Sequence, residues 1–438
     1  MKATTSYRTA FIIVTLLFFL WGFITILLDS LIPRLRDIFE LSYFQAGLVQ
    51  FAFFLAYLTF SLPAGFLLSK IGYKRGIIVG LTIMAIGCLL FYPAASYRIF
   101  GIFMLGYFAL ACGITVLQVA ANPYVAVLGS EEGASSRLNL SQAINSLGTT
   151  LAPLVGAMFL LNDAIKSPEE IQLLSDADKN AYLLAEATTV QLPFLLLAAS
   201  IGLLALVFVF IKLPTIMEKA PQGGYGQLLK NKIVRLGVVG IFVYVGAEVA
   251  IGTYLVNYFL SMGLDQVILQ SDWLRTIPER ALGTPIDAID PKAMMGSFVF
   301  LYWGGAMVGR FIGAYLTRVF QPTQVLAVFA LLAVSMLVIS MTTQGITAMF
   351  SILAVGLFNS IMFPTIFTLT LAGQGQYKPQ ISGLLCMAIV GGAVIPPLCG
   401  YLADLGGFKS AWLLLVGCYG YILYFALNRK KMLTPKIM

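Results

Sequence analysis

Four side-chain amides in otherwise apolar stretches are the residues of this chain best suited to bind a polar ligand. Gln118 and Asn122 are four residues apart, and Gln142 and Asn145 are three apart, so each pair shares one face of a helix. A primary amide donates and accepts hydrogen bonds without carrying charge. Two such faces inside a membrane protein would suit a ligand rich in hydroxyl groups. Their alternative role is structural, because buried amides also bridge neighbouring helices.

Two carboxylates, Asp29 and Glu248, also lie in apolar stretches. A carboxylate in the hydrocarbon interior costs at least about 2.5–3.5 kcal/mol, so such residues usually serve a function. Either carboxylate could bind Na⁺ or take up a proton, because a desolvated carboxylate favours its neutral form. Asp29 is the predicted coupling residue, and Glu248 is predicted to contact the substrate. Further oxygen ligands for Na⁺, a hard cation, would come from Thr115, Gln118 or Asn122. The alternatives are an interfacial acid for Asp29 and a structural pair with a neighbouring basic or amide group for Glu248.

The elements that must position these residues are membrane helices. Of the 438 residues, 59% are hydrophobic and 11% are charged, and the mean hydropathy is +0.91. Apolar runs of about 20 residues recur along the chain, and each is long enough to cross a bilayer as a helix. The net charge of +8 does not indicate nucleic-acid binding, because the basic residues lie in short loops between these runs. The absence of histidine excludes a histidine metal site or proton relay.

The sequence predicts twelve spans with both termini in the cytoplasm. Most of the 27 Lys and Arg residues then lie in inner segments, as the positive-inside rule requires. Most of the 19 acids lie in outer segments. The first run is read as an uncleaved helix. The predicted spans cover residues 9–32, 44–69, 77–96, 99–127, 138–162, 189–212, 235–261, 294–317, 323–343, 345–373, 380–404 and 410–428.

The chain divides into an N-terminal half (1–213), a cytoplasmic linker (214–233) and a C-terminal half (234–438), with six spans in each half. The halves repeat, since Gly148, Pro153 and Gly156 have the same spacing as Gly392, Pro397 and Gly400. Residues 65–70 (GFLLSK) similarly resemble residues 313–318 (GAYLTR). Two six-helix halves related by an axis along the membrane normal form the fold of the major facilitator superfamily, with substrate at mid-membrane between the halves.

Several motifs resemble the fucose/galactose/glucose–cation symporter family of that superfamily, over essentially all twelve spans. They are FFLW (18–21) followed by Asp29, FQAGLVQ (44–50), AANPY (120–124), RLNLSQ (137–142), NSLG (145–148) and PTIF (364–367). The resemblance implies a monosaccharide transporter driven by a cation gradient. It implies proton coupling at Asp29, as in the fucose–proton symporters, and sugar contacts by Gln142 and Asn145. Phe363 stands where the fucose symporters have a tyrosine in the sugar cavity.

Two positions depart from the fucose symporters. Gln118 replaces a glutamate implicated in sugar binding and protonation, and Glu248 stands where those proteins have an uncharged residue. The stretch around Glu248 looks more like the glucose/galactose branch, some members of which use sodium. Because a glutamine cannot titrate, we favour Na⁺ over a proton as the coupling ion, with Asp29 as its expected ligand.

Other candidate contacts come from aromatic and basic residues. Sugars stack on aromatic faces, which makes Trp21, Phe363 and Tyr302 candidates, and Asn359 is a candidate amide from the second half. A gating role is assigned to the basic inner loop after the second span and to its counterpart at the end of the eighth. The gating residues are Gly72, Lys74, Arg75 and Arg310. Anchoring of the topology by positive charge is the alternative role for them.

The sequence therefore predicts an all-α, cation-coupled hexose symporter of a bacterial inner membrane that works by alternating access. Glucose, galactose or mannose is the expected substrate. The alternatives are a proton-coupled L-fucose-type symporter and an uncoupled facilitator or exporter of the same fold. An enzyme is not expected, because the chain has no phosphate loop and no paired acids at helical spacing. The expected partners are the sugar, Na⁺ or a proton, and the lipid bilayer, with no nucleic acid, no cofactor and a monomeric state.

Overall fold

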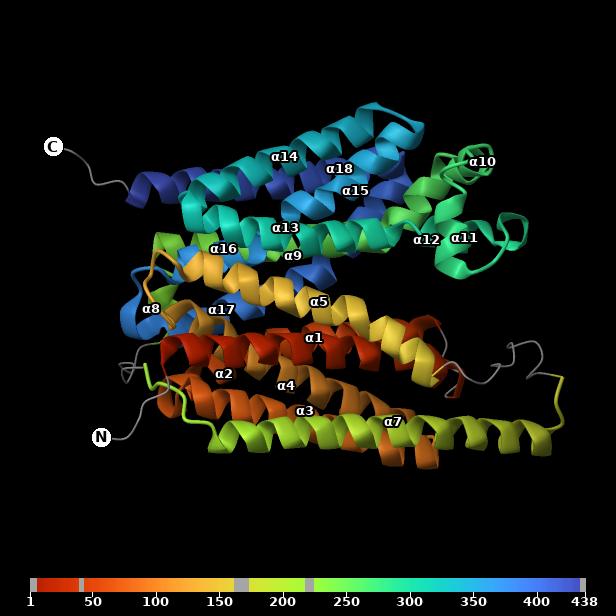
Figure 1. Cartoon of the computed structure of the whole chain (residues 1–438), viewed down its shortest axis with the longest axis horizontal. Coiled ribbons are helices and arrows are strands. Elements are labelled where there is room, and N and C mark those ends of the chain that lie inside the picture. Colours follow the sequence, from red (N-terminus) through yellow and green to blue (C-terminus); the bar gives the residue numbers. More distant parts are fainter. Residues whose placement is uncertain (1–5, 39–42, 161–172, 217–223, 434–438) are drawn as a thin grey trace. The chain divides into compact units, whose positions relative to one another are not determined.

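The computed structural model describes residues 6–38, 43–160, 173–216 and 224–433. Throughout these ranges every regular element is a helix, and no strand occurs among them (Figure 1). Long apolar sequences fold this way in a bilayer because a helix satisfies every backbone hydrogen bond within its own segment. Residues 217–223 of the predicted linker are outside the described residues.

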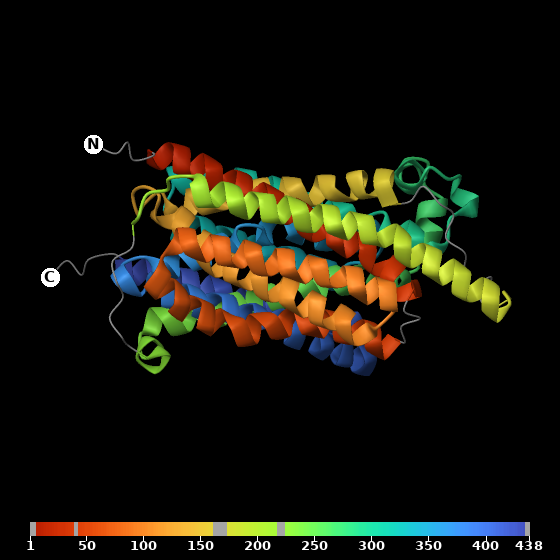
Figure 2. The ribbon, with the colours of Figure 1, turned by 90° about the horizontal axis from the view of Figure 1, so that it is seen from below.

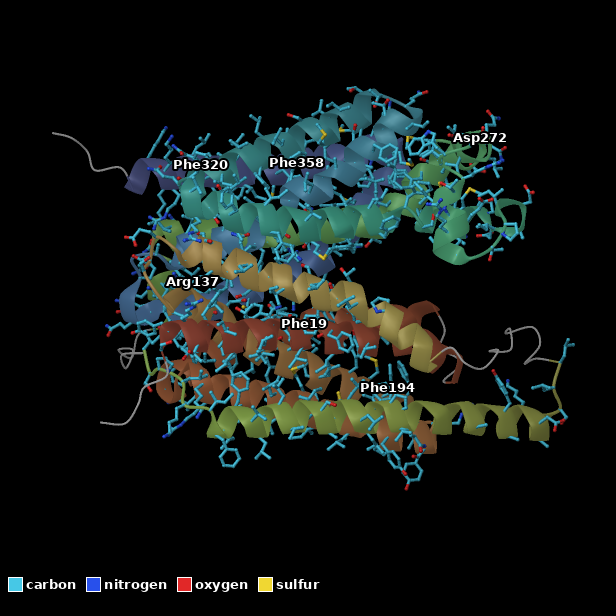
Figure 3. The ribbon with its side chains drawn as sticks, in the orientation of Figure 1. Phe19, Arg137, Phe194, Asp272, Phe320 and Phe358 are labelled. Carbon is cyan, nitrogen blue, oxygen red and sulfur yellow. The ribbon has the colours of Figure 1, made fainter. Side chains whose placement is uncertain are left out.

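Within its described residues, the first half of the sequence forms six long helices. α3 packs against both α4 and α7 (Figure 2). Phe194 of α7 is labelled in Figure 3. Its ring stacks on that of Phe91 of α3, with ring centroids 4.3 Å apart. The helices are α1 (Tyr7–Ile38), α2 (Tyr43–Ile71), α3 (Tyr73–Tyr97), α4 (Phe100–Val127), α5 (Ala134–Leu160) and α7 (Asp176–Phe210).

The second half contains long helices and several short ones. The predicted span 345–373 is divided at Ser360 and Ile361 into two helices, and one residue of α18, Gly407, has φ +74°, which breaks that helix. The elements are α8 (Tyr225–Leu228), α9 (Lys232–Ser261), α10 (Leu264–Leu269), α11 (Thr276–Leu282), η1 (Ile286–Ala288), α12 (Pro291–Gly296), α13 (Val299–Val319), α14 (Pro322–Thr342), α15 (Gly345–Asn359), α16 (Met362–Leu371), η2 (Gly375–Tyr377), α17 (Lys378–Met387), η3 (Ala388–Val390) and α18 (Gly391–Leu433).

Ten candidate membrane spans lie in the described part of the chain, judged by length and apolar composition. One of them, residues 375–431, is 57 residues long and contains the break at Gly407. It covers both the eleventh and the twelfth predicted spans. α5, which covers the fifth predicted span, is not among the ten.

The helices pack as two compact units that differ from the two sequence halves. Unit 1 consists of residues 1–130, 144–225 and 373–387, and unit 2 of residues 131–143, 226–372 and 388–438. Each half therefore contributes one segment to the packing of the other. We call residues 131–143 and 373–387 the exchanged segments. The first contains the start of α5, and the second contains α17.

Candidate functional site

The amides of α4 belong to unit 1. Gln118 is half-buried, and its Oε1 atom is buried without a hydrogen-bond partner among the described residues. Asn122 is fully buried one turn further along the helix. The hydroxyl of Thr115 donates to the carbonyl oxygen of Ala111 in its own helix at 2.9 Å. An accepting oxygen is therefore available at Gln118, as binding of either a hydroxyl or a cation requires.

The two amides of α5 fall on either side of the boundary between the units. Gln142 belongs to unit 2 and is 9% exposed, whereas Asn145 belongs to unit 1. The Asn145 Nδ2 atom donates to the carbonyl oxygen of Phe18 at 2.7 Å, which ties α5 to α1. One donor of Asn145 thus has a structural partner, the alternative role expected for a buried amide.

The remaining first-half candidates lie on α1 and around the start of α3. Trp21 is 6% exposed and packs edge-on against Phe18 at 5.5 Å between ring centroids. Asp29 lies within α1, but its side chain is outside the described residues, so its predicted coupling role stays a prediction. Gly72 precedes α3 with φ +84°, in the left-handed region that favours glycine. The Lys74 Nζ atom donates to the Val209 carbonyl oxygen at 2.9 Å, and Arg75 follows it in the first turn of α3.

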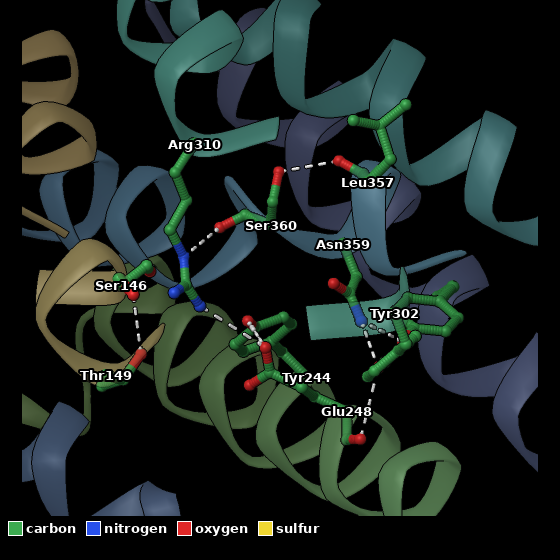
Figure 4. Close-up of polar contacts among 10 residues, drawn as sticks. Ser146, Thr149, Tyr244, Glu248, Tyr302, Arg310, Leu357, Asn359 and Ser360 are labelled. Carbon is green, nitrogen blue, oxygen red and sulfur yellow. Dashed lines mark hydrogen bonds and ion pairs between the residues drawn. The ribbon is translucent and has the colours of Figure 1, made fainter. Parts of the chain in front are cut away.

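A group of polar residues in unit 2 contains a charge pair (Figure 4). The Arg310 Nη2 atom is 3.6 Å from Glu248 Oε1, and the two side chains are 17% and 13% exposed. The Tyr244 hydroxyl donates to the same Oε1 at 2.7 Å. A carboxylate in apolar surroundings needs such partners, because an unpaired buried charge is strongly destabilising. Glu248 therefore forms the pair with a basic group that was expected as the alternative to a binding role.

Arg310 is positioned by two neighbouring elements. It lies in the second half of α13, where its side chain faces Glu248 of α9, and its Nε atom donates to the Ser360 carbonyl oxygen at 3.3 Å (Figure 4). Ser360 itself keeps helical dihedrals (φ −51°, ψ −42°), but its carbonyl oxygen has no backbone donor four residues on, because residue 364 is proline. The sequence placed Arg310 at the end of its span among gating residues, whereas the structure places it beside a carboxylate.

A chain of buried hydrogen bonds surrounds this pair. Asn359 Nδ2 donates to the Tyr302 hydroxyl at 2.8 Å and to the Tyr419 hydroxyl at 3.1 Å. The Tyr302 hydroxyl in turn donates to the Glu248 carbonyl oxygen at 3.3 Å. Asn359, Tyr302 and Tyr419 are all 0% exposed, and Asn359 Oδ1 has no hydrogen-bond partner among the described residues. These hydrogen bonds join α9, α13, α15 and α18 to one another, with the Asn359 oxygen left over as an acceptor.

Close helix packing brings these groups together. A Cβ atom on Gly356 of α15 would lie 2.1 Å from the Tyr302 carbonyl oxygen, so only glycine permits this approach of α13. Phe363 is half-buried on α16, and its ring lies 5.7 Å from that of Phe367. The described ranges contain no group of three or more His, Cys, Asp or Glu residues placed to hold a metal ion.

Sequence reasoning missed Tyr244, Tyr419 and Ser360, and it considered Tyr302 only for stacking. Tyr244 could have been predicted from the sequence, because it lies four residues before Glu248 and shares its helix face. Tyr419 and Ser360 carried no such local signal. Ser360 contacts a residue 50 positions away in the sequence, and Tyr419 contacts one 60 positions away.

Comparison with known proteins places the chain in a family. The Major Facilitator Superfamily model matches residues 10–385. The chain is 47% identical to a protein named glucose/galactose transporter from Brucella abortus, over 97% of this chain and 95% of the relative. It is 33% identical to the L-fucose-proton symporter of Escherichia coli, over 98% and 95%.

A solved structure agrees with these relatives. It is that of FucP, a Major Facilitator Superfamily transporter in the outward conformation, with a TM-score of 0.87 and 32% identity, over 97% of this chain and 99% of that one. Together with the many apolar helices and the bacterial relatives, these similarities identify a multi-pass protein of the bacterial inner membrane. The chain belongs to the Major Facilitator Superfamily, in the group that contains these glucose/galactose transporters and the L-fucose-proton symporter.

Proposed function

We propose that the protein is a cation-coupled hexose symporter that works by alternating access and takes glucose, galactose or mannose. The proposal includes twelve spans, both termini in the cytoplasm, a linker at 214–233 and a monomeric state. It involves no chemical conversion of the sugar and no cofactor. The observation that carries it is the 47% identity to a glucose/galactose transporter along nearly the whole of both chains.

The geometry of the polar groups supports a hydroxyl-rich ligand. Gln118 carries a buried accepting oxygen without a partner among the described residues of unit 1, and Glu248 and Arg310 carry an acceptor and a donor in unit 2. Each of these side chains is partly exposed although it lies in an apolar helix. Hydrogen bonds to charged groups are stronger than those between neutral groups, so a pyranose hydroxyl would be held most firmly at the charge pair.

Asp29 is the proposed coupling residue. The cation would strengthen sugar binding, and by linkage the sugar would strengthen cation binding by the same factor. We expect Na⁺, because position 118 carries an amide that cannot titrate. A proton is the second candidate, favoured by the full-length similarity to the L-fucose-proton symporter, and an L-fucose-type substrate is its corollary.

The deciding measurement is uptake of radiolabelled glucose, galactose, mannose and L-fucose into proteoliposomes under an imposed Na⁺ gradient or an imposed proton gradient, each applied alone. Accumulation above equilibrium under Na⁺ alone supports sodium symport, and accumulation under the proton gradient alone supports proton symport. No accumulation of glucose, galactose, mannose or fucose under either gradient contradicts the symporter proposal.

Asp29→Asn separates coupling from translocation. Loss of the carboxylate should abolish uphill accumulation while sugar exchange down its gradient continues, because only the coupled step requires the ion. Counterflow of labelled hexose in the same vesicles measures exchange. An uncoupled facilitator would instead show identical exchange and net flux in wild type and variant.

A further inference from the structure

The two oxygens of the Glu248 carboxylate have different surroundings. Both the Tyr244 hydroxyl and the Arg310 guanidinium lie against Oε1, at 2.7 and 3.6 Å. No described residue donates a hydrogen bond to Oε2, and the side chain retains 13% exposure. The carboxylate therefore has one oxygen held by the protein and one available to a ligand.

Tyr244 cannot itself reach a ligand. It is 1% exposed, and its hydroxyl is already directed at Glu248 from one turn away on the same helix (Figure 4). Its hydrogen bond fixes the rotation of the carboxylate and hence the direction of Oε2. Tyr302 constrains the same helix by a different route, because it donates to the backbone carbonyl of Glu248 and not to its carboxylate.

We propose that Tyr244 is a specificity-determining positioning residue, which orients Glu248 Oε2 to accept a hydrogen bond from one particular hydroxyl of the hexose. This inference rests on the proposed hexose transport and deepens it, by assigning one hydroxyl to one oxygen. A charged acceptor whose orientation is fixed discriminates strongly, because a sugar lacking the matching hydroxyl leaves the carboxylate oxygen unpaired. Tyr244 acts through Glu248 and makes no contact with the sugar.

The test combines Tyr244→Phe with a panel of glucose analogues that each lack one hydroxyl. Affinities are measured by competition against labelled glucose in proteoliposomes, together with the maximal rate. We expect Tyr244→Phe to weaken glucose binding about tenfold with a maximal rate within about twofold of wild type, since one hydrogen bond to a charged group is lost. For a single analogue, the one lacking the matched hydroxyl, wild type and variant should bind alike.

Tyr302→Phe is the matched control. It also removes one tyrosine hydroxyl from the hydrogen bonds around Glu248, but that hydroxyl does not contact the carboxylate. It should lower the thermal unfolding temperature of the purified protein and leave the ranking of the analogues as in wild type. Glu248→Gln should abolish the preference for the matched hydroxyl, since the fixed charged acceptor is replaced by a neutral amide.

The outcomes separate this inference from the proposed function. If wild type neither binds nor transports any hexose, the proposed function fails and the inference with it. If wild type transports hexoses but Tyr244→Phe weakens all analogues by the same factor, or changes only the maximal rate, the positioning role is refuted while hexose transport stands. Identical analogue rankings in Tyr244→Phe and Tyr302→Phe would also refute it.

Discussion

The two exchanged segments occupy equivalent places in the two sequence halves, yet they make their contacts with different chemistry. Asn139 lies nine residues before Gly148, and Gly383 lies nine residues before Gly392, so the repeat aligns these two positions. The repeat likewise aligns Gly65 of α2 with Gly313 of α13. In unit 1, Gly65 lies against Gly383, and in unit 2, Gly313 lies against Asn139.

The contact in unit 1 depends on the absence of side chains. A Cβ atom on Gly383 would lie 2.6 Å from the Ser61 carbonyl oxygen and 3.3 Å from the Gly65 Cα atom. One hydroxyl accompanies this approach, as Ser382 Oγ donates to the Val119 carbonyl oxygen at 2.8 Å. The contact is therefore a backbone fit, which any larger side chain destroys at once.

The contact in unit 2 consists of separate hydrogen bonds. Asn139 Nδ2 donates to Thr365 Oγ1 at 3.2 Å and to the Ser135 carbonyl oxygen at 2.9 Å. The hydroxyls of Ser135 and Thr368 are 2.7 Å apart, and Ser136 donates to the Ala314 carbonyl oxygen at 2.7 Å. Asn139 Oδ1 is buried without a hydrogen-bond partner among the described residues, which offsets part of this gain.

This difference bears on transport because each exchanged segment contacts helices from the other half of the sequence. If the protein works by the proposed alternating access, the halves move against each other, and we expect both contacts to form and break in each cycle. Under the proposed topology both segments begin on the cytoplasmic side. We expect a single substitution at the glycine contact to cause a large loss of hexose uptake. At the polar contact, each substitution should cause a small loss.

The largest effect is expected from Gly383→Leu. Overpacking against backbone costs typically about 1–3 kcal/mol and has no rotamer solution here, so the uptake rate should fall by about tenfold or more. Cys386 of α17 is 0% exposed and lies one turn further along, which makes it a built-in reporter. Its alkylation by a membrane-permeant maleimide should accelerate in the variant.

Gly202→Leu is the control for this substitution, because a Cβ atom there meets nothing within 4 Å. Its rate of hexose uptake and its rate of Cys386 alkylation by the maleimide should equal those of wild type. If Gly383→Leu takes up hexose at the wild-type rate, the close approach in unit 1 plays no part in the transport cycle.

A smaller effect is expected from Asn139→Ala. The variant loses two hydrogen bonds but also removes a buried acceptor that lacks a partner, so uptake should change by only about two- to fivefold. Initial rates of hexose uptake at several sugar concentrations measure the change. A loss as severe as that of Gly383→Leu would remove the distinction between the two contacts.

The smallest effects are expected from Ser382→Ala and Ser136→Ala, a matched pair with one substitution in each unit. Each loses a single hydroxyl donation to a carbonyl, worth about 0.6 kcal/mol in membrane helices, so uptake should change by less than about threefold. The two variants should agree with each other in parallel uptake assays. Unequal losses would mean that the units differ in more than the Asn139 and Gly383 positions.

Near unit 1's glycine contact, a tyrosine adds a donor whose state does not change with pH. Tyr225 lies outside the spans, in α8, and its hydroxyl donates to the Leu62 carbonyl oxygen. Burial raises the pKa of Tyr225 to about 12, so this hydroxyl remains neutral and able to donate at any physiological pH. Its contribution to packing is therefore constant across the pH range in which a proton gradient would be tested.

The helical membrane fold and part of the candidate site could be predicted from the sequence, because both depend on local spacing. Apolar runs gave the spans of α1 to α4, and the internal repeat indicated two related halves. The two repeated halves indicated the superfamily, which the family model confirms, and short motifs indicated the symporter family within it. Glu248 was identifiable as a functional or paired acid because charge inside an apolar run is costly wherever it lies.

The tertiary structure alone decided which groups meet. Glu248 pairs with Arg310, and Asn359 joins Tyr302 to Tyr419. Each half also contributes a segment to the other unit. All of these contacts join residues that are far apart in the sequence. Helical periodicity determines which face of a helix a residue occupies. It does not determine which neighbouring helix that face meets, because small residues such as Gly356 and Gly383 set the approach of the helices by fitting a particular partner backbone.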